Sequence, residues 1–241
     1  MPGNGLRRTA LAAVTFAAAA ASTAALAPLV EGAAIGPGWR VVNLPQQKIP
    51  ATRYSVETVD GRQALRVHAQ ASYGNLVHDW PAGSVAPQRL RWSWRVQQPN
   101  PATDLRNKAG DDLAVKVCMS FDLDMARVPF FERQVLHLAR SRTGEALPAA
   151  TLCWAWGGAE AQGALLPNAY SRRVRYIVLR TAQDAASTWF EESRDVAADF
   201  KRAFGDESAE LPPVTALIVA GDADNTGGTS VAHVSGLRAQ P

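Results

Sequence analysis

Two short acidic segments carry the side chains best suited to chemistry. Near the C-terminus, Asp222, Asp224 and Thr226 alternate along GDADNTGG, so that side-chain oxygens recur at every second position. This spacing resembles the start of a calcium loop, in which oxygen ligands alternate around one cation. Asp222, Asp224 and Thr226 are therefore the candidate metal ligands. Calcium is the candidate ion, another cation with oxygen ligands is the alternative, and no other cofactor is expected.

An EF-hand is nevertheless excluded. The residue that should supply the bidentate acid at the end of such a loop is His233, and no helices flank the segment. Asp, Asn and Gly also serve turn chemistry, which makes a plain β-turn an alternative. The third alternative is a loop in which Asp222, Asp224 and Asn225 bind a polar ligand.

The second acidic segment, KAGDD, places Asp111 and Asp112 directly before a strand expected over 113–122. Asp122 closes the far end of that strand, roughly 33 Å away at the usual rise per residue. Only one end of the strand can therefore share a site with the 222–226 loop, and we favour the end with Asp111 and Asp112. Paired carboxylates of this kind are also the groups that hydrolyse glycosides.

Aromatic residues next to a long loop add further candidates. Trp154 and Trp156 lie two residues apart on one strand, so they share a face that could stack on a sugar ring or belong to the core. The segment 157–172 that follows is long, contains Asn168 and Tyr170, and has few apolar residues. Long loops beside aromatic residues are frequent binding sites.

Alternation of apolar and polar residues dominates the elements that must position these groups. In RLRWSWRVQ, for example, Trp92 and Trp94 share the face that we expect to be buried. Asp60 and Gly61 predict a tight hairpin. The expected strands are 39–44, 53–59, 63–71, 89–97, 113–122, 151–156, 174–181, 187–194, 214–220 and 229–237.

Two segments depart from this alternation. The first, 124–144, has helical spacing of its apolar residues at Phe131, Val135, Leu138 and Ala139. The second, 195–205, begins with Asp195 as a candidate N-cap. Because the strands do not alternate with helices, the sequence predicts an all-β fold, an antiparallel β-sandwich of jelly-roll type with two short helical insertions.

The N-terminal segment has the features of an export signal. Arg7 and Arg8 precede an uncharged, Ala-rich stretch that ends in small residues. We expect residues 1–34 to be a signal peptide with a short leader, and residues 35–241 to form one domain without a membrane span. The predicted location is the periplasm or the exterior, through a Sec signal; the arginine pair also fits a twin-arginine signal.

Charge and cysteine content narrow the classes of partner. The net charge of +3 includes no long basic run, so no nucleic-acid partner is expected. Cys118 and Cys153 are the two cysteines, and both lie in expected strands. An oxidising compartment favours a disulfide between them, while two buried thiols are the alternative. The sequence does not indicate an oligomeric state.

Several segments in order resemble an exported bacterial family known as domain of unknown function 3047. They are WSWRV, KAGDDLAVKVCMSFD, LCWAWGG, PNAYSRRVRYIVLRT, ESRDVAADFKRAFG and DADNTGG, and the resemblance runs from about Trp39 to about Gly236. The family motif NPY corresponds to Asn168-Ala169-Tyr170, while Gly228 replaces an acid, which weakens the cation hypothesis. The resemblance implies an exported domain and no particular activity. The strand order also looks like that of jelly-roll carbohydrate-binding modules.

The sequence thus favours a noncatalytic domain that binds a polar small molecule or a glycan. One alternative is a hydrolase that acts on envelope polysaccharide through paired Asp residues, and another is a structural partner of an envelope protein. We expect the ligand to be bound at one end of the sandwich by Asp111, Asp112, Trp154, Trp156, Asn168, Tyr170, Asp222, Asp224 and Asn225.

Overall fold

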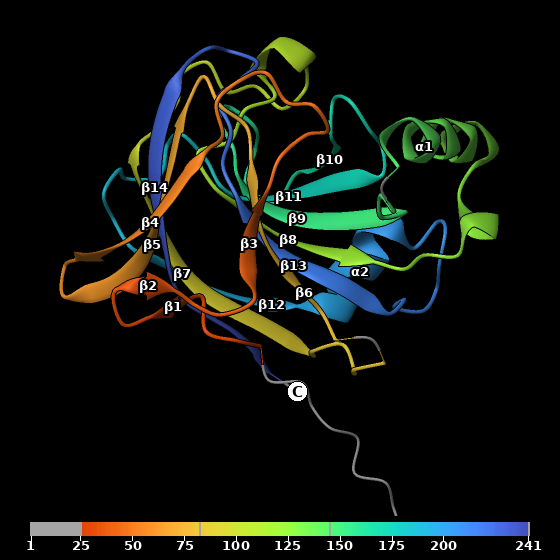
Figure 1. The fold of residues 1–241 in the computed structure, drawn as a ribbon, viewed down its shortest axis with the longest axis horizontal. Helices are drawn as coiled ribbons and strands as arrows, with labels where there is room; N and C mark the ends of the chain where they lie inside the picture. The colour runs from red at the N-terminus through yellow and green to blue at the C-terminus, as the bar shows by residue number, and fades with distance from the viewer. Residues whose placement is uncertain (1–25, 82, 145, 241) are drawn as a thin grey trace, which may run out of the picture.

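Two β-sheets stacked face to face form the body of the molecule (Figure 1). The structure, a computed structural model, describes residues 26–81, 83–144 and 146–240. These residues confirm the all-β fold class, the sandwich of jelly-roll type and its two helical insertions. The predicted signal peptide falls mainly on residues 1–25, outside the described residues.

The first sheet has seven strands within the described ranges. In spatial order they are β10 (Leu165–Pro167), β11 (Val174–Arg180), β9 (Ala150–Trp156), β8 (Lys116–Phe121), β13 (Val214–Ala220), β6 (Asn75–Asp79) and β3 (Trp39–Val42). The alternation pattern missed β6 and β10, which are short and lie beside loops.

The second sheet has five strands in the described part of the chain. They are β12 (Phe190–Asp195), β7 (Arg89–Gln98), β14 (Thr229–Gln240), β5 (Arg62–Gln70) and β4 (Arg53–Val59). Asp60 and Gly61 join β4 to β5, and their positive φ angles of 51° and 74° suit the expected two-residue hairpin. All ten predicted strands therefore exist, with ends shifted by a few residues.

One pair of neighbouring strands departs from the antiparallel pattern. β9 and β11 run parallel, in register from Thr151 opposite Val174. Parallel neighbours require a connection that returns to the starting end of the sheet. The long segment 157–173 makes that return, with β10 pairing antiparallel to β11 on the way.

The core between the two sheets is built around four tryptophans. Trp92 and Trp94 of β7 face Trp154 and Trp156 of β9, with ring centroids 5.5 and 5.8 Å apart across the sheets. All four are at most 3% exposed. Aromatic contacts of this kind supply much of the apolar area that holds a sandwich together.

The fold also includes residues upstream of the boundary expected at residue 35. β1 (Val30–Glu31) and β2 (Ala34–Ile35) form a small hairpin, and Leu29 is 3% exposed within the main core. Since Leu29 packs against the sandwich, the folded domain begins before the predicted boundary.

The two α-helices pack very differently. α2 (Val196–Phe204) is capped as expected by Asp195, which accepts a hydrogen bond from the Ala198 N–H. This helix buries Phe200 and Phe204.

Two 3₁₀ turns, η1 (Lys108–Gly110) and η2 (Met125–Arg127), complete the described helical segments. None of these helices is long and apolar enough to cross a membrane.

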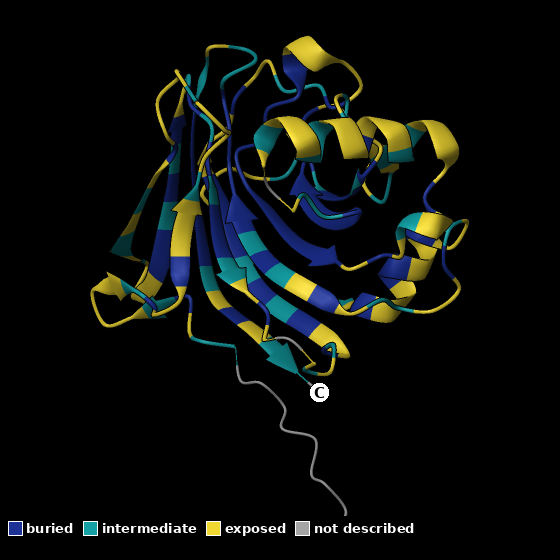
Figure 2. Cartoon of the chain, turned by 45° about the vertical axis from the view of Figure 1, so that its right-hand side comes forward, coloured by how far each residue is buried: buried dark blue, intermediate teal, exposed yellow. Residues whose placement is uncertain are grey.

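The longer helix, α1 (Phe130–Thr143), confirms the predicted helical segment but leaves most of its apolar residues exposed. Phe131 and Val135 are 81% and 68% exposed, and Leu136 is the only described residue of the helix that is buried. In Figure 2 the outer face of this helix is largely exposed. Glu132 ties α1 to the end of the segment that precedes β11, through ion pairs with Arg172 and Arg173.

Candidate functional site

The outer face of the seven-stranded sheet is hollowed into a groove of about 1090 Å³. Its lining crosses the strands from β3 at one side to β11 at the other. Five spacings between neighbouring strands make this width about 24 Å. One wall is formed by Arg140 of α1 and the segment 146–149 that follows the helix.

Alternate residues of the central strands form the floor of the groove. Lys116, Cys118 and Ser120 of β8 lie beside Thr151 and Cys153 of β9. Cys118 and Cys153 are directly opposite each other in register and form a disulfide. The disulfide, rather than two separate thiols, therefore fastens the two middle strands under the groove.

The two acidic turns meet at one end of this groove, as the sequence predicted. Asp112, which is fully buried, accepts hydrogen bonds from the backbone N–H groups of Asn225 and Thr226 at 3.1 and 2.8 Å. The side chains of the same two residues donate to it at 3.2 and 2.5 Å. The carboxylate of Asp112 therefore holds the 222–226 loop in place.

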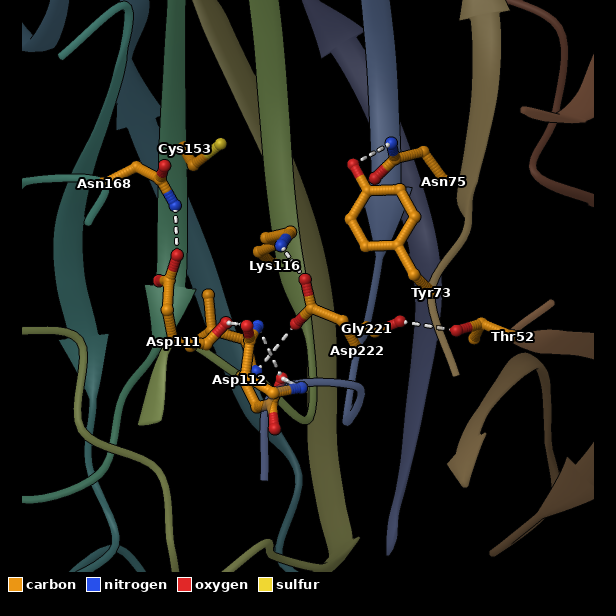
Figure 3. A network of polar contacts seen from close by, with 12 residues as sticks. Thr52, Tyr73, Asn75, Asp111, Asp112, Lys116, Cys153, Asn168, Gly221 and Asp222 are labelled. Atoms are coloured by element: carbon orange, nitrogen blue, oxygen red, sulfur yellow. Dashed lines mark hydrogen bonds and ion pairs between the residues drawn. The ribbon is translucent and has the colours of Figure 1, made fainter. Parts of the chain in front are cut away.

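Asp222 is bound just as firmly on the other side of that loop. Its Oδ2 lies 2.5 Å from Lys116 Nζ, and its Oδ1 accepts the Leu113 N–H at 2.7 Å (Figure 3). Burial alone would lower the pKa of Lys116, but the Asp222 carboxylate outweighs it and raises that pKa well above the usual value. This pair is charged and structural.

Asp111 and Asp224 differ because each keeps a free oxygen. Asp111 is 5% exposed, and its Oδ2 accepts a hydrogen bond from Asn168 Nδ2 (Figure 3). The other oxygen, Asp111 Oδ1, is buried without a partner among the described residues, and so is Asp224 Oδ1. Both carboxylates line the groove.

The environment raises the pKa of both carboxyl groups. Burial is the main cause, and it brings the pKa of Asp111 to about 6 and that of Asp224 to about 6. The neighbouring carboxylates Asp222 and Asp112 add to the effect at both positions, while Lys116 opposes it. The groove therefore ends in two carboxyl groups that ionise close to neutral pH.

Three tyrosines complete this acidic end. The Tyr170 O–H donates to Asn225 Oδ1, and its ring is 58% exposed at the rim. Tyr176 is buried beside Asn168, which donates to its hydroxyl oxygen at 2.9 Å. Tyr73 lies across the groove next to Asn75 (Figure 3). Burial raises the pKa of Tyr73 and Tyr176, so both hydroxyls remain protonated.

Most of the predicted residues come together here, but the two tryptophans do not. Trp154 and Trp156 point to the core from β9, while Thr151 and Cys153 of the same strand face the groove. Their indole N–H groups are bound to Asp199 and to the Thr181 carbonyl. The prediction that they line the site is therefore wrong. Asp111, Asn168, Tyr170, Asp222, Asp224 and Asn225 do line the groove, with Asp112 behind them.

The calcium hypothesis is also contradicted by the arrangement. Both oxygens of Asp222 are engaged, by Lys116 and by the Leu113 N–H. The Thr226 hydroxyl oxygen accepts hydrogen bonds from Asn100 Nδ2 at 2.8 Å and from the Gly228 N–H at 3.1 Å, so these oxygens already have partners. Within the described ranges, no group of three or more His, Cys, Asp or Glu side chains is placed to hold a metal ion. The loop is thus a turn anchored by Asp112 that also lines the groove.

Sequence reasoning missed Lys116, Tyr73 and Tyr176. Lys116 lies on the polar side of the expected strand 113–122, and that side is the groove floor. The signal that could have found it is an isolated lysine four residues after two adjacent acids. Tyr176 and Tyr73 carried no comparable signal, because a single tyrosine in a strand or loop is usually a packing residue.

Comparison with known proteins identifies one family. The family described as "Protein of unknown function (DUF3047)" matches residues 37–238, which agrees with the resemblance seen in the sequence. The chain matches none of the curated proteins.

Among solved structures, similarity extends to two mutants of the family 29 carbohydrate-binding module CBM29-2. One is in complex with cellulohexaose; it is 10% identical, with 89% of this chain and 89% of that chain covered and a TM-score of 0.37. The second is also 10% identical, with 90% and 89% covered and a TM-score of 0.37. Similarity at this level carries no information about the ligand of this chain.

Proposed function

Because the chain belongs to DUF3047, a family of unknown function, we propose a function from its groove: noncatalytic binding of a polar ligand, a glycan, in the periplasm or cell envelope. The disulfide on the groove floor fits an oxidising compartment outside the cytoplasm. The predicted signal peptide supports the same location.

One observation carries the proposal. Buried polar atoms in folded proteins nearly always have hydrogen-bond partners, yet Asp111 Oδ1 and Asp224 Oδ1 have none among the described residues. Both belong to carboxylates at the end of an open groove, where an incoming donor would complete their hydrogen bonds. Hydroxyl groups of a sugar are such donors, and the exposed Tyr170 ring offers a face for a sugar ring.

The shape of the groove supports an extended ligand rather than a small one. Its span of about 24 Å across six strands exceeds the length of a single sugar. Its size is comparable to the upper range of ligand pockets in proteins. A short oligosaccharide lying across the strands matches this shape.

Thermal melts of the purified protein with a panel of oligosaccharides test the proposal. A ligand at a concentration of 100 times its Kd stabilises the folded state by about 2.7 kcal/mol. For a domain of this size, that raises Tm by roughly 5 to 11 °C. Asp224→Ala should abolish the rise, whereas Glu191→Ala, with a 79% exposed side chain on the other sheet, should retain it. A panel without any shift contradicts the proposal.

A second candidate, a hydrolase acting on polysaccharide, is favoured by the pair of carboxyl groups with pKa values of about 6. Such groups can exchange a proton with a glycosidic oxygen or a water molecule. Asp112 and Asp222 are excluded from this role by their complete sets of contacts. The assay is the release of reducing ends from polysaccharide. If the protein releases them, and if Asp111→Asn and Asp224→Asn each stop the release, the protein hydrolyses the polysaccharide rather than only binding it.

A further inference from the structure

We propose that the acidic end of the groove recognises a positively charged amino group, carried by a glycan with unacetylated amino sugars. This inference rests on the proposed glycan binding and names the chemistry that the groove selects. The inference starts from the excess of negative charge in the cluster formed by Asp111, Asp112, Asp222 and Asp224.

The cluster contains more negative than positive charge. Asp111, Asp222 and Asp224 line this end of the groove, and Asp112 lies behind them. Lys116 is the cation buried among them in the described part of the chain, and it is engaged by Asp222 at 2.5 Å. Lys108 lies outside the cluster, with its ammonium 5.1 Å from the centre of the Tyr170 ring. An occupant that brings a positive charge would restore the balance.

The hydrogen-bonding capacity points to the same chemistry. Asp112 and Asp222 are satisfied by backbone and side-chain donors, whereas Asp111 and Asp224 each retain a buried, unpartnered Oδ1. A hydroxyl offers a single donor and no charge, while an ammonium group offers three donors and a full positive charge. Hydrogen bonds between two charged groups are the stronger kind. An ammonium group therefore satisfies both requirements of this end of the groove.

A metal ion would meet the charge requirement but not the geometry. Within residues 26–81, 83–144 and 146–240, no three acidic or imidazole groups converge as metal ligands. Beside these carboxylates the groove presents tyrosine hydroxyls and the Asn168 amide, which donates to Asp111 Oδ2 and to the Tyr176 hydroxyl. This environment suits an organic amine attached to a larger polar molecule.

Calorimetry with matched oligosaccharides tests the inference. The probes are glucosamine hexamer, N-acetylglucosamine hexamer and cellohexaose, added to the purified protein at pH 7. We expect the glucosamine hexamer to bind about 10-fold or more tightly than the other two, as one charge-assisted hydrogen bond implies. Asp111→Asn and Asp224→Asn should each remove that preference, whereas Glu191→Gln should keep it. Thermal melts verify that the variants fold.

The outcomes separate the two proposals. Equal binding of the three hexamers, with Asp111→Asn without effect, overturns the amine inference and leaves glycan binding standing. Lack of binding by every hexamer and by a lysine oligopeptide overturns both. A lysine oligopeptide that binds in an Asp111-dependent manner, when the hexamers do not, supports recognition of the amino group and overturns the glycan as its carrier.

Discussion

Replacement of Asp112 by Ala should destabilise the fold strongly, because this buried carboxylate is the acceptor that holds Asn225 and Thr226 of the 222–226 loop. Four donors from Asn225 and Thr226 point to it. Loss of the acceptor leaves two backbone N–H groups unpartnered, at about 1 to 3 kcal/mol each. Relief of repulsion on Asp111 and Asp224 offsets part of this cost. We expect the free energy of unfolding to fall by about 3 to 4 kcal/mol.

Urea denaturation and thermal melts measure this change. A loss of 3 to 4 kcal/mol lowers Tm by roughly 6 to 16 °C in a domain of this size. Asp124→Ala is the matched control, since this exposed residue accepts one turn hydrogen bond, from Ala126, and its loss should cost about 1 kcal/mol or less. If Asp112→Ala costs no more than the control, Asp112 does not anchor the loop and the reasoning fails.

Three other predictions concern the same groove. Lys116→Met should lower the free energy of unfolding by about 3 to 5 kcal/mol in urea denaturation, because Asp222 is left buried without its cation. Adding Asp222→Asn should recover part of the loss; a further decrease would argue against the ion pair. Stability should decline as pH rises from about 4 to about 6, since folding raises the pKa of Asp111 and Asp224 to about 6 and so favours their protonated forms. Replacing both Asp111 and Asp224 by Asn should remove the part of the decline in Tm that these two carboxyl groups cause. If the double variant keeps the pH profile of the wild type, this explanation is refuted. Reduction of the disulfide, whose cysteines are 35 residues apart, should lower the free energy of unfolding by about 3 to 4 kcal/mol. Chemical denaturation with reductant, compared with denaturation without it, measures this difference. An identical midpoint in both conditions would contradict that expectation.

Local pattern was sufficient to predict most strands and the meeting of the acidic turns. Alternation along 53–59 and 214–220 matches β4 and β13 residue for residue. The 33 Å span of the middle strand left only one end at which Asp112 could meet the 222–226 loop, and the structure places them in contact there. These conclusions needed only the geometry of one strand.

What alternation could not predict is which face of a strand or helix meets the core. Trp154 and Trp156 were known to share a face, but their burial depends on Trp92 and Trp94 from the opposite sheet. In α1 the apolar spacing predicted the helix, but it did not specify that Val135 would be exposed. Both outcomes depend on partners distant in sequence, which a periodic pattern does not specify.

The two sides of the groove are held with unequal strength. Its floor is fastened by sheet pairing and a covalent link, while the α1 wall relies on buried Leu136, two Arg140 contacts to the Leu147 carbonyl and ion pairs of Glu132. Segments with few buried contacts open at a lower free energy than the rest of a protein. We therefore expect hydrogen exchange to be faster in this wall than in the strands of the floor, so that the width of the groove depends on the less stable of its two sides.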